Sequence, residues 1–145
     1  TSAPQSSQIP RTGPADSDFL YDNGRNVGQA TYITTQAVSL AGNLEILEID
    51  NTAGTQLIFV KFWDDNHASP PTVGTTIPIL SLPCPAGVRL SYNFMRNDPG
   101  TDHPSTLPYF QLGLWYNVSI YGGSTGTSTS APAVAPTLKM VYLKH

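Results

Sequence analysis

The chain has 145 residues, a usual length for one domain, and a domain of about 150 residues buries roughly two thirds of its unfolded surface. Only 12% of the residues are charged, the net charge is −3, and the seven basic residues are scattered, which excludes a typical nucleic-acid-binding surface. The single cysteine, Cys84, excludes an intrachain disulfide, and no run of about 18 apolar residues predicts a membrane span.

Residues 1–28 are predicted to form an extended N-terminal arm. The segment contains Pro10 and two further prolines, and its only apolar patch is Phe19–Tyr21. Such a composition buries too little apolar surface to offset the entropy of ordering. We therefore expect the arm to be held by its own domain or by a neighbouring chain, with Phe19–Tyr21 as a short anchoring strand before a turn at Asp22–Gly24.

Residues 29–145 are predicted to form an all-β domain, an antiparallel β-sandwich or jelly roll of about seven or eight strands. The apolar pattern of Leu44–Asp50 breaks at Ile46, which predicts a bulge. A helix is the alternative there, but the short length and the flanking turn residues favour a strand. The expected strands are Thr31–Leu40, Leu44–Asp50, Gln56–Trp63, Ile77–Leu82, Val88–Met95, Tyr109–Tyr121 and Thr137–Lys144.

Two polar loops, Asp64–Thr76 and Asn97–Pro108, hold the candidate ligands for an ion. The first loop opens with Asp64, Asp65, Asn66 and His67, and the second contributes Asp98, Asp102 and His103. A metal site would need both loops to converge. The alternative is a pair of solvated loops with turn-forming residues, and this alternative is favoured, so we assign no metal and no cofactor.

Two tryptophans are candidates for a contact surface. Side chains alternate along a strand, so Trp63 lies opposite Phe62, and Trp115 opposite Tyr116. If Phe62 and Tyr116 face the core, both tryptophans lie outside it, where they would contact a sugar or a protein. The candidate contact surface therefore comprises Trp63, Trp115, Asp64, Asp65, His67 and His103.

Cys84 is the only candidate nucleophile of the thiol type, with His67 or His103 as its base. It lies at the end of an expected strand and between two prolines, which favours a small buried apolar role instead. No catalytic motif stands out elsewhere in the sequence. We therefore expect that the protein is not an enzyme.

One segment, Asn51–Gly87, holds a succession of short motifs. These are Asn-Thr at 51–52, V-K-F-W-D at 60–64, A-S-P-P-T-V-G-T-T-I-P-I-L at 68–80 and P-C-P-A-G at 83–87. In this order the segment resembles a module of tailed-bacteriophage virion proteins, although Pro71 is an extra proline and the next strand is not Gly-rich. The resemblance implies a β-sandwich structural protein, often a capsid decoration (cement) protein or a fibre-associated module, commonly trimeric and without enzyme activity.

The sequence thus predicts a phage structural protein that binds the outer capsid surface and stabilises the head. The expected partners are the major capsid protein and other copies of the chain in a trimer, with no nucleic acid and no membrane. Synthesis is expected in the host bacterial cytoplasm, and the final location in the virion. The alternative is a glycan-binding or receptor-binding module of a head or tail fibre. Contacts of the arm with the capsid or a neighbouring subunit are assigned to Pro10, Phe19, Leu20 and Tyr21.

Overall fold

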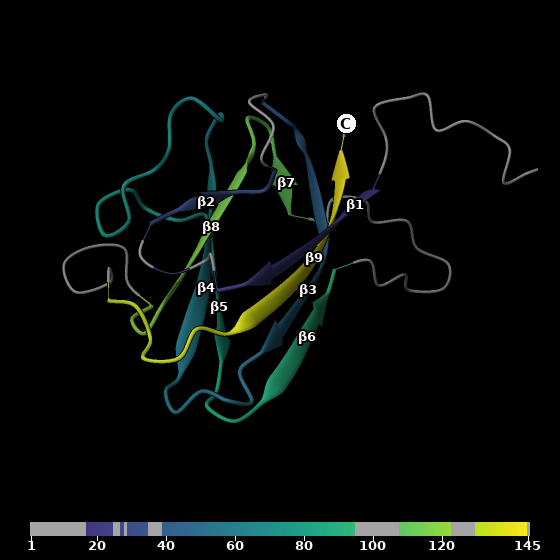
Figure 1. Ribbon diagram of the computed structural model, residues 1–145. Helices are drawn as coiled ribbons and strands as arrows, with labels where there is room; N and C mark the ends of the chain where they lie inside the picture. The colour runs from purple at the N-terminus through teal and green to yellow at the C-terminus, as the bar shows by residue number, and fades with distance from the viewer. Residues whose placement is uncertain are drawn as a thin grey trace, which may run out of the picture.

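The computed structural model describes residues 17–24, 27, 29–34, 39–94, 108–122 and 130–144, and over these residues it is all-β (Figure 1). The prediction of an all-β chain is therefore confirmed. Within the described ranges nothing helical has the length and apolarity that crossing a membrane requires. The strands are β1 Ser17–Asn23, β2 Thr31–Tyr32, β3 Gly42–Asp50, β4 Ile58–Asp64, β5 Leu80–Cys84, β6 Arg89–Asn93, β7 Tyr109–Phe110, β8 Leu114–Ser119 and β9 Thr137–Lys144.

The strands form two antiparallel sheets. The first sheet has the order β1-β9-β3-β6, with β7 paired to β3 beside this path, and the second has the order β2-β8-β4-β5. Figure 1 shows the two sheets on opposite sides of the molecule. Their buried side chains form one apolar cluster, which includes Leu47 and Met140 from the first sheet and Val60 and Val118 from the second. This arrangement is consistent with a β-sandwich.

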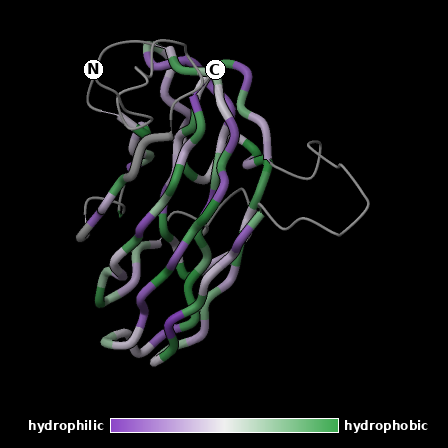
Figure 2. Tube along the Cα trace, turned by 90° about the vertical axis from the view of Figure 1, so that its right-hand side faces the viewer, coloured by the Kyte–Doolittle hydropathy of each residue, from purple (hydrophilic) through white to green (hydrophobic). Residues whose placement is uncertain are grey.

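Strand β3 contains the irregularity that the sequence predicts. Its register with β9 shifts between Leu44 and Ile46, so Glu45 is the extra residue of a bulge. After the bulge, Leu47 and Ile49 alternate toward the core, where both are fully buried. Figure 2 views the molecule from the right-hand side of Figure 1 and shows hydrophilic and hydrophobic residues alternating along the strands.

Strand β1 falls within the expected arm. Ser17–Asn23 pairs antiparallel with β9 over its whole length, so this part of the segment belongs to the first sheet of its own chain. Leu20 is partly buried and packs against the core of its own chain, and its expected contact with the capsid or a neighbouring subunit stays a prediction. Tyr21 is 55% exposed. Residues 1–16, and Pro10 with them, lie outside the described residues.

The expected strand Tyr109–Tyr121 is interrupted. Strand β7 ends at Phe110 and β8 begins at Leu114. Leu112, which one continuous strand would place on the same face as the buried Phe110 and Leu114, is 45% exposed. The break coincides with Gly113, whose φ of 150° is outside the range that other residues favour. Because the chain turns here, the alternation expected from Phe110 onward restarts at Leu114.

Candidate functional site

The outer face of the second sheet holds the two tryptophans of the predicted contact surface. Strands β4 and β8 pair with Trp63 opposite Trp115 and with Lys61 opposite Asn117. These four residues alternate with core residues such as Phe62, so they lie on the face away from the first sheet. All four are nevertheless buried. The second sheet is therefore covered on both of its faces at this point.

The two tryptophans are covered by the connection between β4 and β5. The indole nitrogen of Trp63 donates a hydrogen bond to the carbonyl oxygen of Thr76 at 2.8 Å. That of Trp115 donates to the carbonyl oxygens of Asp65 at 3.0 Å and Asn66 at 3.1 Å. Only 1% of Trp63 and 8% of Trp115 is exposed. The alternation was predicted correctly, but the exposure of the tryptophans was not, because the loop folds back over them.

Asp64 stabilises the turn that precedes β8. Its carboxylate accepts backbone hydrogen bonds from Gln111 at 3.0 Å, Leu112 at 2.7 Å and Gly113 at 3.2 Å. The amide of Asp65 returns a hydrogen bond to the carbonyl oxygen of Gly113 at 3.1 Å. A carboxylate engaged by three backbone amides holds a loop in place, and this is the role that the geometry gives Asp64.

His67 belongs to an aromatic cluster on the same face. The ring of Tyr32 lies 4.9 Å from that of Trp115 and 6.4 Å from that of His67. The hydroxyl of Tyr32 accepts a hydrogen bond from the amide of Leu40 at 3.0 Å, and Ser39 Oγ lies 3.4 Å from His67 Nδ1. Burial raises the pKa of Tyr32 above its usual value. The cluster thus packs the segment before β3 onto the second sheet.

No convergent ion site is present among the described residues. Burial, and then the neighbouring charge of Asp64, raise the pKa of Asp65. Over the described part of the chain, His, Cys, Asp and Glu side chains form no group of three or more that could hold a metal. His103, with Asp98 and Asp102, lies outside the described residues, so its predicted place beside Asp64 stays a prediction.

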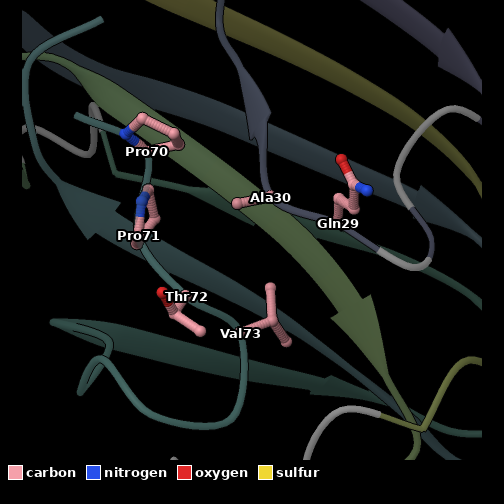
Figure 3. Close-up of a pocket in the computed structure, with 6 residues that line it drawn as sticks. All are labelled: Gln29, Ala30, Pro70, Pro71, Thr72 and Val73. Atoms are coloured by element: carbon pink, nitrogen blue, oxygen red, sulfur yellow. The ribbon is translucent and has the colours of Figure 1, made fainter. Parts of the chain in front are cut away.

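A small hollow lies beside β8 on this covered face. Figure 3 shows its lining, in which Pro70 and Pro71 face Ala30, and Thr72 and Val73 close one end. Gln29 completes the lining, and its carbonyl oxygen accepts a hydrogen bond from Asn117 Nδ2 at 3.0 Å. None of these lining side chains is charged. The hollow therefore offers apolar contact and few groups that could take part in chemistry.

Cys84 is fully buried, as the flanking prolines indicate. Its sulfur lies 3.4 Å from the carbonyl oxygen of Val88. Burial, followed by the charge of Asp50, raises the pKa of the thiol. A raised pKa keeps the thiol protonated, and a protonated thiol is a poor nucleophile. The geometry thus gives Cys84 a packing role.

Asn51 is a structural residue whose role sequence reasoning missed. Its side-chain nitrogen donates to the carbonyl oxygens of Gln56 and Pro85, both at 3.0 Å, and of Cys84 at 3.4 Å. A Cβ atom at Gly54 would come within 2.0 Å of Asn51 Oδ1, which explains the glycine there. Asn51 therefore joins the turn after β3 to the turn after β5. The Asn-Thr and P-C-P-A-G motifs, which flank these turns, were the signal in the sequence.

Sequence reasoning also missed a charged surface on the outer face of the first sheet. It presents two ion pairs, between Arg89 and Asp50 at 2.9 Å and between Lys139 and Glu48 at 3.6 Å. The nitrogen of Lys139 also lies 6.0 Å from the centre of the Tyr21 ring. The signal in the sequence was the spacing of Glu48 and Asp50, because residues two apart in a strand lie on one face.

Comparison with known proteins gives no relative: no family model, no curated protein and no solved structure matches this chain.

Proposed function

We propose that this protein is a non-enzymatic structural protein of a bacteriophage virion, a decoration protein that binds the outer capsid surface and stabilises the head. The order of strand pairing supports this proposal most. Strand β1 pairs with β9, β2 with β8, β3 with β6, and β4 with β5. If β7 is set aside, these are nested pairs of eight strands, an order that supports a jelly roll, the fold of viral capsid domains, lectins and cupins.

The residues behind the sequence resemblance support the same proposal, because they build the fold. Asn51 joins two turns, as described above. Gly74 has a φ of 91°, and Thr76 provides the carbonyl oxygen that binds Trp63. The shared motifs therefore specify a particular sandwich with a loop folded over one face. A protein that resembles virion modules at such positions is expected to share their architecture.

The proposed mechanism is adhesion. A decoration protein that spans the boundary between capsid subunits adds contacts that must break before the shell opens. Each contact can be weak, because many copies placed by the symmetry of the shell act together. The proposed partners are the major capsid protein and other copies of this chain. Residues 1–16, with Pro10, remain the proposed arm. Tyr21 in β1 is 55% exposed and is also proposed to contact the partner.

The glycan-binding alternative loses its expected platform. It required Trp63 or Trp115 in an open groove, and both are buried beneath the chain's own loop. A sugar would have to bind without them, and stacking on aromatic rings is the usual source of affinity at such sites. Decoration of the capsid is therefore the better supported function.

The test uses phage heads assembled without this protein. Purified protein is added to the heads, and bound and free protein are separated by sedimentation and imaged by electron cryomicroscopy. We expect regular density on the outer shell and a higher temperature of head disruption. Deletion of residues 1–16 is expected to weaken binding, whereas deletion to residue 28 would also remove β1. Absence of binding to the heads, with binding to tails or glycans instead, would contradict the proposal.

A further inference from the structure

The two sheets differ in what covers their outer faces. On the second sheet, the chain's own loop covers Trp63 and Trp115. On the first sheet, the residues that face outward stay accessible: the side chain of Arg89 is 58% exposed and that of Lys139 is 45% exposed. Among the described residues, the charged side chains of the first sheet are therefore open to a partner, whereas the two tryptophans of the second sheet are not. We therefore expect a protein contact on the outer face of the first sheet.

The centre of this face consists of cross-strand pairs between β3 and β9. Glu48 is opposite Lys139, and Ile46 is opposite Val141. All four alternate with core residues, so they share the outer face, and none is classed as buried. One row is thus a pair of opposite charges, and the next row is a pair of apolar side chains.

The same two rows on a second copy of the chain would be complementary to these rows. A two-fold axis that lies between the two facing sheets and runs parallel to β3 and β9 places β9 of one copy over β3 of the other. Lys139 of each copy then faces Glu48 of the other, and Val141 of each copy faces Ile46 of the other. An isologous contact needs such a self-complementary patch. Sheets that pack face to face lie about 10 Å apart, a distance that these side chains can bridge.

The charge of the face favours the same occupant. Glu48 and Asp50 are balanced by Arg89 and Lys139, so the four charges sum to zero. A partner with a strong charge of one sign gains little from such a surface. In the two-fold arrangement Glu48 and Lys139 each face a residue of opposite charge, and Asp50 faces the neutral Thr137. Tyr21, at 55% exposure beside Lys139, lies on the same face and would contact β6 of the other copy at the height of Ser91.

We propose that the outer face of β1-β9-β3-β6 binds the same face of a second copy of the chain, around a two-fold axis between β3 and β9. The proposal does not depend on the proposed capsid function. It also differs from the trimer that the sequence resemblance implies, because a three-fold contact joins two different surfaces of each copy.

The test measures the mass of the purified protein in solution by analytical ultracentrifugation and light scattering. We expect a dimer at about 100 µM, a concentration well above the dissociation constant of a specific protein contact. Ile46→Lys should weaken dimerisation at least about tenfold. Ile79→Lys is the matched control, because Ile79 is 55% exposed before β5 of the other sheet. A monomer or a trimer at this concentration, or equal effects of both substitutions, would overturn the proposal.

Charge reversal provides a second, independent test. Glu48→Lys alone makes each Lys139 face another lysine across the contact, and Lys139→Glu alone makes each Glu48 face another glutamate, so each variant should be a monomer. An equimolar mixture should form a heterodimer, because every facing pair is then of opposite sign. The internal ion pair of each chain stays broken in the mixture, so only a contact between chains restores association. Variants that still dimerise alone, or a mixture that stays monomeric, would overturn the proposal. Melting temperatures of both variants check that they fold.

Discussion

Asn51 shows how much of the fold depends on single polar side chains. It is 1% exposed, and its side-chain nitrogen serves three carbonyl oxygens in two turns. A buried carbonyl that loses its donor keeps the cost of desolvation without the compensating bond. The turns after β3 and β5 are remote in sequence but adjacent in space, so this one amide joins two turns at the same end of the molecule.

We expect Asn51→Ala to lower the free energy of unfolding by about 2 kcal/mol, since it leaves buried acceptors without a donor. Asn51→Asp should cost more, because it turns a carboxylate toward carbonyl oxygens. Urea denaturation measures both effects. Thr55→Ala, at an exposed position of the same turn, is the control and should change stability by less than about 0.5 kcal/mol. An Asn51→Ala variant as stable as this control would contradict the assigned role.

The carboxyl group of Asp50 affects how the stability of the fold changes at acidic pH. Hydrogen bonds from the hydroxyl and amide of Thr52, and then from Arg89, lower the pKa of Asp50 from 3.8 to about 2. A lowered pKa in the folded state stabilises the fold above pH 3.8, and this contribution is lost as the pH falls toward about 2. Thr52 has the largest effect, so Thr52→Val should raise the pKa of Asp50 and reduce the loss of stability over this range.

Carbon NMR of the Asp50 carboxyl group, together with melting temperatures across the same pH range, measures both changes. Arg89→Gln is the comparison variant and should also raise the pKa of Asp50, because it removes a hydrogen bond and a positive charge from the carboxylate. Ser81→Ala, in β5 of the other sheet, should leave this pKa unchanged. If neither Thr52→Val nor Arg89→Gln raises the pKa of Asp50, these hydrogen bonds do not set its acidity.

At the scale of elements, the alternation of apolar residues predicted which side chains face the core. It did not predict which other segments pack against a strand. The bulge in β3 and the alternation of β9 were read correctly from Ile46 and from Leu138 and Met140. The burial of Trp63 was not predicted, because it depends on the path of the connection between β4 and β5, which the residues around Trp63 do not determine. The break before β8 was missed for a similar reason: Asp64, 47 residues away from Gln111, fixes that turn.

Strand β1 is attached to the opposite sheet by one buried hydrogen bond. The hydroxyl of Tyr116 in β8 donates to the carboxylate of Asp22 at 2.5 Å, and both residues are nearly inaccessible to solvent. The bond spans the core and joins residues 94 positions apart in the chain. It fixes the N-terminal strand against the second sheet as well as against β9.

Tyr116→Phe should therefore lower the free energy of unfolding by about 1–3 kcal/mol, because it removes one donor from a buried carboxylate. Tyr121→Phe, at an exposed tyrosine just after β8, should be nearly neutral. Chemical denaturation of both variants provides the measurement. If the two variants are equally stable, the bond between β8 and β1 contributes nothing to the docking of β1.

At the scale of the whole molecule, the pairing of the first strand with the last makes the two ends of the chain interdependent. The alternation of apolar residues predicted strands in residues 29–145 but not the pairing of β1 with β9. Alternation shows which face of a strand is buried, but not which other strand pairs with it. For that reason residues 17–23 were assigned to an arm. Their pairing with β9 places them in the first sheet.

This arrangement predicts a sharp boundary for truncation. A chain that begins at residue 17 keeps β1 and should unfold cooperatively, as the full chain does. A chain that begins at residue 24 loses β1, which exposes the backbone edge of β9 and uncovers core that Leu20 packs against. An unprotected edge of this kind pairs with other chains, so we expect aggregation or a strongly lowered melting temperature. Circular dichroism and size-exclusion chromatography compare the two chains. Equal melting temperatures and equal solubility would mean that β1 is dispensable, and the segment would then be an arm after all.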